Sequence, residues 1–139
     1  MRILGIDYGL KRTGIAVTDS EQILASSLSV LAANEVIPFI ESYILKEPVE
    51  GIVVGMPKNL DNSDTDGTQL AKGFVKKLKL HFPQLYIETI DERFTSSMAK
   101  KYMIQSGLKK TDRRDKSRID QLSAEIILSD FLKIKENLK

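Results

Sequence analysis

A continuous apolar run at residues 51–54, Gly-Ile-Val-Val, constrains the fold of this chain more than any other feature of its sequence. A strand that is apolar on successive residues has to be covered on both faces, which is typical of a strand inside a sheet that lies between layers of helices. The chain has 139 residues, of which 42% are hydrophobic. That length suits one domain and is too short for two, so we expect residues 1–139 to form a single domain.

The residues before this run predict strands and turns. Residues 2–6 and 13–17 are rich in β-branched side chains and flank a polar turn, a pattern typical of a hairpin, and a third strand is expected within 23–31. Apolar positions at helical spacing then predict a helix that begins near Asn34, a candidate N-cap residue, and ends before Pro48.

Helices and strands are expected to alternate in the rest of the chain. The apolar spacing predicts a helix over 70–80, a strand over 85–90 and a helix that begins near residue 95 and ends at Gly107. The apolar positions of a last helix are Ile119, Leu122, Ile126, Ile127, Phe131 and Leu132. The predicted fold class is α/β, with a mixed sheet in which three antiparallel strands are followed by parallel strands and helices cover both faces.

The composition excludes several kinds of site. The chain has no cysteine and one histidine, His81, which excludes disulfide frameworks, thiolate metal sites and histidine-rich zinc sites. The apolar amino terminus is interrupted by Asp7, so it predicts neither a signal peptide nor a membrane span. We therefore expect a cytoplasmic protein with no membrane partner.

Positive charge is concentrated in residues 100–118, although the formal net charge of the whole chain is only +2. The segment contains two acidic residues and eight basic ones: Lys100, Lys101, Lys109, Lys110, Arg113, Arg114, Lys116 and Arg118. Such a concentration favours a polyanionic partner such as nucleic acid, because each neutralised phosphate releases condensed counterions. The alternative is a solvated loop whose charges flank helix ends.

Three carboxylates are expected near the carboxyl ends of strands or at the start of a helix. Asp7 ends the first strand, Glu92 follows the strand over 85–90, and Asp120 opens the last helix. Carboxylates that converge repel one another unless a cation is present, and Mg²⁺ or Mn²⁺ suits such oxygen ligands. Each residue also has a simpler interpretation: Asp7 as a turn residue, Asp120 as a helix-dipole residue and Glu92 as a surface partner of Arg93.

The turn after the first strand has the pattern D-x-G-x-x-x-x-G, from Asp7 to Gly14. It resembles the phosphate-binding hairpin of the sugar kinase and actin class of ATPases, in which glycines let backbone amides approach phosphate oxygens. Those enzymes close two lobes around a nucleotide, and this chain is too short to supply both. We retain the phosphate-binding interpretation, with Lys11 and Arg12 supplying positive charge.

The chain resembles the YqgF family, also called RuvX, a pre-16S rRNA nuclease and Holliday junction resolvase-like family. The resemblance runs from end to end and rests on Gly5-Ile6-Asp7-Tyr8-Gly9, Lys11 to Asp19, Val54-Gly55-Met56-Pro57, Asp91-Glu92-Arg93-Phe94-Thr95 and Ile119 to Ala124. It implies an RNase H-like fold, a small bacterial cytoplasmic protein and a metal-dependent phosphodiesterase that acts on structured nucleic acid.

By this resemblance Asp7, Glu92 and Asp120 are the catalytic residues and the ligands of Mg²⁺ or Mn²⁺. Asp91 is the neighbouring alternative to Glu92. RNase H-like resolvases often carry a fourth acid one helical turn after the third, where this chain has Ser123.

The basic residues are the candidates for binding substrate. Lys11, Arg12 and Arg93 are expected to hold the phosphate, since lysine and arginine form charge-assisted hydrogen bonds with its oxygens. The backbone of the substrate is expected to follow Lys109, Lys110, Arg113, Arg114 and Arg118.

The function predicted from these observations is hydrolysis of phosphodiester bonds during processing of the ends of pre-16S rRNA. One alternative is a Holliday junction resolvase that acts on branched DNA, and another is an RNA-binding protein without turnover that acts in ribosome assembly or transcription. The expected partners are structured RNA or branched DNA and ribosomal precursor particles, bound by a monomer or weak homodimer.

Overall fold

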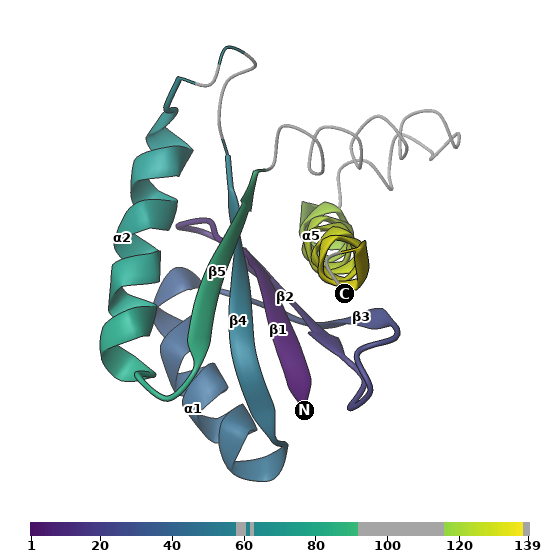
Figure 1. Ribbon diagram of the computed structural model, residues 1–139. Helices are drawn as coiled ribbons and strands as arrows, with labels where there is room; N and C mark the ends of the chain where they lie inside the picture. Colours follow the sequence, from purple (N-terminus) through teal and green to yellow (C-terminus); the bar gives the residue numbers. More distant parts are fainter. Residues whose placement is uncertain (58–60, 62, 92–115, 138–139) are drawn as a thin grey trace.

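The computed structural model describes residues 1–57, 61, 63–91 and 116–137, and in the last helix it describes side chains from residue 121 onward (Figure 1). Within these residues one sheet contains β1 (Arg2–Asp7), β2 (Thr13–Thr18), β3 (Ala25–Leu31), β4 (Val49–Met56) and β5 (Tyr86–Asp91), in the order β3-β2-β1-β4-β5. β1 pairs with β2, and β2 with β3, in antiparallel fashion, whereas β4 is parallel to both β1 and β5. This confirms the predicted mixed sheet.

Helices cover both faces of the sheet, as predicted. The short η1 (Ala33–Glu35), α1 (Val36–Lys46) and α2 (Asp66–His81) lie on one face, and α5 (Lys116–Asn137) crosses the other (Figure 1). None of the described helices is long and apolar enough to cross a membrane. The helix expected over 95–107 lies outside the described residues.

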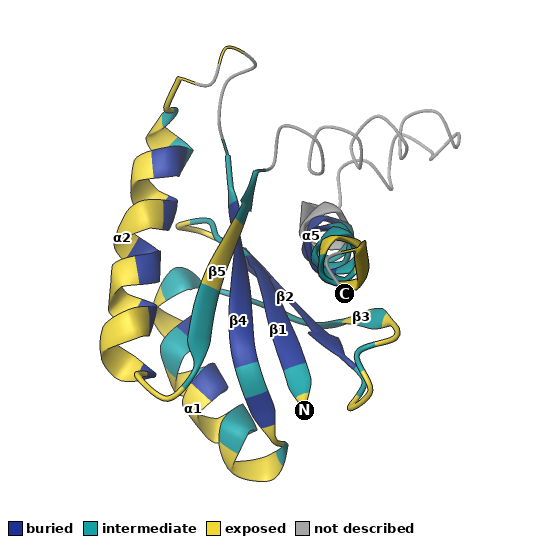
Figure 2. Ribbon diagram, in the orientation of Figure 1, coloured by how far each residue is buried: buried dark blue, intermediate teal, exposed yellow. Residues whose placement is uncertain are grey.

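Strand alternation divides the core into two layers, and this explains the continuous apolar run at residues 51–54 (Figure 2). Ile52 and Val54 are buried against α1 and α2, whereas Val53 between them is buried against α5. Successive residues of a strand point to opposite faces, so a strand covered on both sides is apolar throughout. The layer beneath α5 consists of Ile3, Ala16, Val53, Ala124, Ile127 and Leu128.

The buried face of α5 differs from the predicted one. Leu122 and Ile126 are only partly buried, whereas Ser123, Ala124, Ile127 and Leu128 are buried. The prediction followed the large apolar side chains, but the contact is made in part by small ones. A Cβ atom added at Gly5 of β1 would lie 2.7 Å from the Cβ of Leu128. The helix therefore approaches β1 closely because the strand has no side chain at that position.

The predicted N-cap at Asn34 is wrong, because Asn34 lies inside η1. The Glu35 side chain accepts a hydrogen bond from the Ala32 backbone N–H at 3.1 Å. The start of α2 is capped more conventionally, since the Thr65 hydroxyl accepts from the Thr68 backbone N–H at 3.1 Å.

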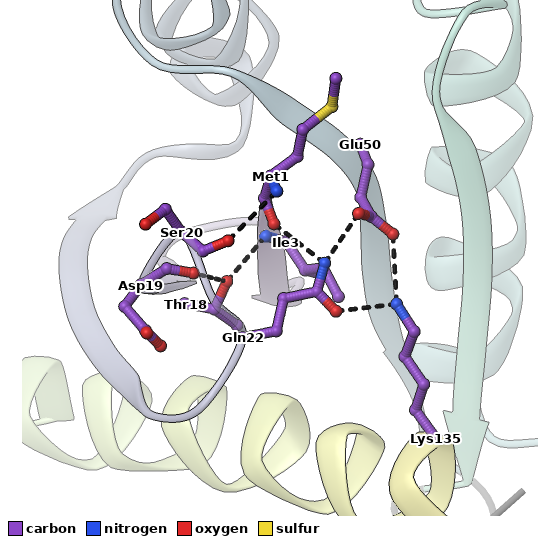
Figure 3. Close-up of polar contacts among 8 residues, drawn as sticks. All are labelled: Met1, Ile3, Thr18, Asp19, Ser20, Gln22, Glu50 and Lys135. Atoms are coloured by element: carbon purple, nitrogen blue, oxygen red, sulfur yellow. Dashed lines mark hydrogen bonds and ion pairs between the residues drawn. The ribbon is translucent and has the colours of Figure 1, made fainter. Parts of the chain in front are cut away.

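A polar cluster fixes the carboxyl end of α5 near the amino ends of β1 and β4 (Figure 3). We call it the Gln22 clasp, and it consists of Gln22, Glu50, Lys135 and the Met1 carbonyl. The Gln22 amide donates to Glu50 Oε1 at 2.7 Å and to the Met1 carbonyl at 2.9 Å. Lys135 Nζ donates to Gln22 Oε1 at 2.8 Å and pairs with Glu50 Oε2 at 3.2 Å. The clasp thus ties α5 to the β2–β3 turn, β1 and β4.

Candidate active site

Asp7 is the last residue of β1, the strand at the centre of the sheet. It pairs with Gly14 of β2 and is half-buried. Ile3 and Gly5 precede it at two-residue intervals, and both contact α5. Strand alternation therefore places Asp7 on the face that α5 covers, at the carboxyl edge of the sheet. This confirms the predicted position of Asp7 at a strand end.

The direction of α5 relative to β1 is set by contacts along the helix. Near its carboxyl end, Lys135 bonds Glu50 at the amino end of β4. Further towards its amino end, Leu128 and the Ala124 carbonyl lie beside Gly5. The helix is therefore antiparallel to β1, and it leads from its carboxyl end towards the edge where β1 and β4 end.

This direction carries the backbone positions of Asp7 and Asp120 towards the same edge. Asp7 lies two residues beyond Gly5, about 6 to 7 Å along the strand. Asp120 lies four residues before Ala124, about 6 Å along the helix and roughly one turn away. The predicted place of Asp120 in the first turn is wrong, because α5 begins at Lys116. A helix-dipole role confined to the first turn therefore does not account for Asp120.

The turn between β1 and β2 is held by Thr13, which was not among the site residues predicted from the sequence. The Thr13 hydroxyl, fully buried, donates to the Gly9 carbonyl at 2.9 Å and accepts from the Gly9 N–H at 3.2 Å. A Cβ atom at Gly9 would lie 2.5 Å from the Arg12 carbonyl oxygen, so only glycine fits. A threonine directly after a glycine-containing turn was the available signal. The turn presents Lys11 to solvent and leaves Arg12 half-buried.

Tyr8 connects the base of this turn to α2. Its ring stacks on Phe74 with centroids 4.2 Å apart and an interplanar angle of 14°. Because Phe74 is buried in the layer beneath α1 and α2, the stack fixes the start of the turn to the body of the protein.

Asp91 lies on the opposite face of the sheet from Asp7. It is the last residue of β5 and pairs with Met56, which packs into the layer beneath α1 and α2. Tyr86 and Ile90 of the same strand pack instead into the layer beneath α5. Paired residues of neighbouring strands share a face, so Asp91 is not placed beside Asp7.

Glu92, Arg93, Lys109, Lys110, Arg113 and Arg114 lie outside the described residues. Arg118, expected in the basic loop, belongs to α5. Within the part of the chain that the structure describes, no three histidine or acidic side chains form a metal-binding group. Ser123 is 1% exposed, so a carboxylate there would be desolvated at the interface between α5 and the sheet.

A groove of about 710 Å³ lies away from these residues, near the Gln22 clasp. It is lined by Ile23 and Leu24 of the β2–β3 turn and by Leu132 and Lys133 of α5. The candidate site at the carboxyl edge is therefore defined by strand ends and by the direction of α5, and not by this groove.

Strand order and helix placement together define an RNase H-like fold. RuvC of Thermus thermophilus, solved with a Holliday junction substrate, shares it with a TM-score of 0.55 and 18% identity over 97% of this chain and 96% of that chain. The Fowlpox virus resolvase, solved with Holliday junction DNA, gives a TM-score of 0.56 and 11% identity over 100% of both chains.

The chain belongs to the RuvX, or Holliday junction resolvase, family, whose family model matches residues 1–134. A relative from Bacteroides thetaiotaomicron is 46% identical over 96% of this chain and 97% of its own length. One from Flavobacterium psychrophilum is 49% identical over 94% of this chain and 96% of its own length. Both carry the name "Putative pre-16S rRNA nuclease". The predicted family is confirmed, and it places the chain among enzymes that hydrolyse phosphodiester bonds.

Proposed function

We propose that this chain is a nuclease that depends on a divalent cation and cleaves precursor ribosomal RNA near the ends of pre-16S rRNA. The substrate follows the name that its relatives carry. The single observation that carries the site is the antiparallel contact of α5 with β1 at Gly5. Position 7, further along β1, and position 120, earlier in α5, therefore both lie towards the carboxyl edge of the sheet. The carboxyl edge is also where ligands bind in open α/β sheets.

The proposed metal ligands are Asp7, Asp120 and Glu92. Asp91 lies on the opposite face of the sheet from Asp7, so we propose Glu92, which the family resemblance implies, in place of Asp91 as the partner of Asp7.

The donor chemistry fits a hard cation, because the proposed ligands are all carboxylates and the chain has no cysteine. The one histidine, His81, is at the far end of α2 and bonds the Lys77 carbonyl at 2.9 Å. Mg²⁺ or Mn²⁺ would lower the pKa of water and stabilise the charge that develops on the phosphate. We propose both ions as candidates for the site.

The basic residues would bind and orient the substrate. Lys11 and Arg12 stand on the turn that Thr13 holds, directly after Asp7, so they would place a phosphate at the mouth of the site. Arg93 would contact the same phosphate. The flanking RNA backbone would contact Lys109, Lys110, Arg113, Arg114 and Arg118, which would add affinity more than sequence preference.

The test is cleavage of a precursor 16S rRNA fragment with Mn²⁺ and with chelator. Wild-type protein is expected to give discrete products that chelator abolishes. Asp7→Asn is expected to remove cleavage and to retain RNA binding. Asp91→Asn is the matched control, since it makes the same change on the other face of the sheet and is expected to retain cleavage. Unchanged cleavage by Asp7→Asn would contradict the proposal.

A second candidate substrate is branched DNA, which the description of the family favours. Symmetric resolution of a four-way junction requires two active sites and therefore a dimer. The same cleavage assay, run in parallel on a four-way DNA junction, distinguishes the two substrates. Sedimentation of the protein at micromolar concentration shows whether it is a dimer. Junction cutting by a dimer, with precursor RNA intact, would replace RNA by DNA in the proposal. Binding of both without cleavage would identify a binding protein.

A further inference from the structure

The outer face of α2 carries an excess of lysine that the proposed active site does not use. From Lys72 to His81 the helix contains four lysines, Lys72, Lys76, Lys77 and Lys79, and no acidic residue. We call these four residues the lysine face, and all are exposed. An ordinary solvent-facing helix mixes charges of both signs, because oppositely charged side chains three or four residues apart stabilise it.

The charge of this face is largely uncompensated. Lys72 pairs with Asp64 at 2.9 Å, before the start of α2. Among the described residues, the structure shows no acidic partner for Lys76, Lys77 or Lys79. From Lys72 to Lys79 the face extends about 10 Å along the helix axis.

Gly73 lies beside Lys72 at the amino-terminal end of the lysine face, where a glycine costs helix stability. Nothing within the described protein requires it, since a Cβ atom built there would meet no heavy atom within 4 Å. The buried residues of α2 are Thr68, Ala71, Phe74, Val75 and Leu78. At 100° per residue Gly73 lies nearly opposite them and is exposed, so it leaves the helix backbone bare towards solvent. Lys72 lies beside it, and Lys76 and Lys77 lie one turn on.

We propose that the lysine face, together with the adjacent Gly73, is a docking surface for the sugar–phosphate backbone of double-stranded RNA. The inference rests on the proposed function in taking RNA as the nucleic acid. Charge complementarity supports it, because a duplex is a dense row of phosphates and proteins bind double-stranded RNA mainly through phosphate and 2′-hydroxyl contacts. The bare backbone at Gly73 lets such a partner approach more closely than a side chain would allow.

The position of the face suits a substrate held at the active site. α2 begins at Asp66, shortly after β4 ends at Met56 on the carboxyl edge, and it runs back along the sheet on the face opposite α5 (Figure 1). A helical arm of the substrate that leaves the catalytic edge would therefore lie along α2. The lysine face would bind the arm, while the scissile phosphate stays at the edge.

The test measures binding of a fluorescent RNA hairpin with a duplex of about two helical turns, in chelator so that no cleavage occurs. Lys76→Gln/Lys77→Gln is expected to raise Kd about tenfold and to lower the slope of log K against log salt by about two. Lys46→Gln/Lys133→Gln removes the same charge from the exposed ends of α1 and α5, and it is expected to change Kd less than twofold.

Gly73→Gln separates docking from folding. Glutamine favours helix more than glycine does, so the variant is expected to melt a few degrees higher than wild type, yet to bind the hairpin several-fold more weakly. Wild-type affinity in this variant, or equal losses in the two double variants, would overturn the proposal. Equal binding of a DNA duplex of the same length, or equal competition by polyglutamate, would overturn the assignment to RNA.

Cleavage distinguishes this proposal from the proposed function. With Mn²⁺ and saturating protein, the lysine-face variants are expected to cut precursor RNA at the wild-type rate, with only the concentration for half-maximal rate raised. If wild type itself gives no chelator-sensitive cleavage, the proposed nuclease function fails, while the binding measurements still decide whether α2 docks RNA.

Discussion

Replacement of Gly5 by alanine tests the contact that positions α5. The added Cβ atom would lie 2.7 Å from the Leu128 Cβ and 3.3 Å from the Ala124 carbonyl oxygen. Carbon atoms that are not bonded rest about 3.5 to 4.0 Å apart, so α5 would have to move by about 1 Å. Leu128→Ala would not relieve the clash, because alanine keeps the Cβ atom. Overpacking of this kind costs about 1 to 3 kcal/mol.

The assay is thermal unfolding followed by circular dichroism. For a chain of this length, that cost corresponds to a fall in Tm of roughly 3 to 10 °C. Gly73→Ala is the matched control, because it makes the same change where no heavy atom lies within 4 Å. Alanine is favoured over glycine in a helix by about 1 kcal/mol, so this variant is expected to melt higher than wild type. The same glycine-to-alanine substitution is thus expected to lower Tm at position 5 and to raise it at position 73.

The Gly5→Ala variant also tests the active site that we propose. Since α5 carries Asp120, a displacement of about 1 Å relative to β1 is expected to slow cleavage up to about 100-fold at a temperature where the variant is fully folded. A Gly5→Ala variant that melts at or above the wild-type temperature would refute the seating of α5 on β1. Normal cleavage by a destabilised variant would refute the coupling between α5 and the site.

Two further predictions concern the hairpin turn and the Gln22 clasp. Thr13→Val removes the hydroxyl that bonds both backbone groups of Gly9. This variant is expected to lose about 1 to 2 kcal/mol of stability in melting assays and to raise the KM for RNA in cleavage assays. Thr13→Ser keeps a hydroxyl and is expected to restore both the stability and the KM. Burial raises the pKa of Glu50, but hydrogen bonds from Lys135 and Gln22 outweigh it and hold the pKa below the ordinary value of 4.5. The carboxylate therefore stabilises the fold above that value and stops doing so as the pH falls through its folded pKa. The stabilities of wild type and Glu50→Gln, from melting curves, are expected to differ by less than about 1 kcal/mol at pH 7 and to converge as the pH falls below the folded pKa of Glu50. A stability difference that grows towards acid would contradict this sign.

The strands of this fold could be predicted because alternation and buried runs are local signals. The apolar run at 51–54 predicted a strand covered on both faces, and the structure places Ile52 and Val53 in different layers. The buried face of α5 could not be predicted in the same way. The helix approaches β1 at Gly5, where an added Cβ atom would lie 2.7 Å from the Leu128 Cβ and 3.3 Å from the Ala124 carbonyl oxygen. Gly5 has no side chain, so its hydropathy does not mark it as core.

The candidate site was predictable only where it depends on a strand end. Asp7 follows an apolar strand directly, so its position at the carboxyl edge could be inferred from the sequence. The choice between Asp91 and Glu92 required the register of β5 against β4, which no single sequence supplies. The start of α5 was placed too late because its first turn is polar and basic, and Asp120 was consequently assigned to the first turn. That residues 1–139 form a single domain stays a prediction.

Binding of Mn²⁺, measured by calorimetry on the whole chain without RNA, tests the central claim most directly. If Asp7 and Asp120 hold one ion, Asp7→Asn and Asp120→Asn each weaken the binding at least tenfold, and the double variant loses little more than either single variant. Asp91→Asn binds as wild type does. An Asp120→Asn variant with wild-type affinity, or losses that simply add in the double variant, would show that the two carboxylates do not share a cation.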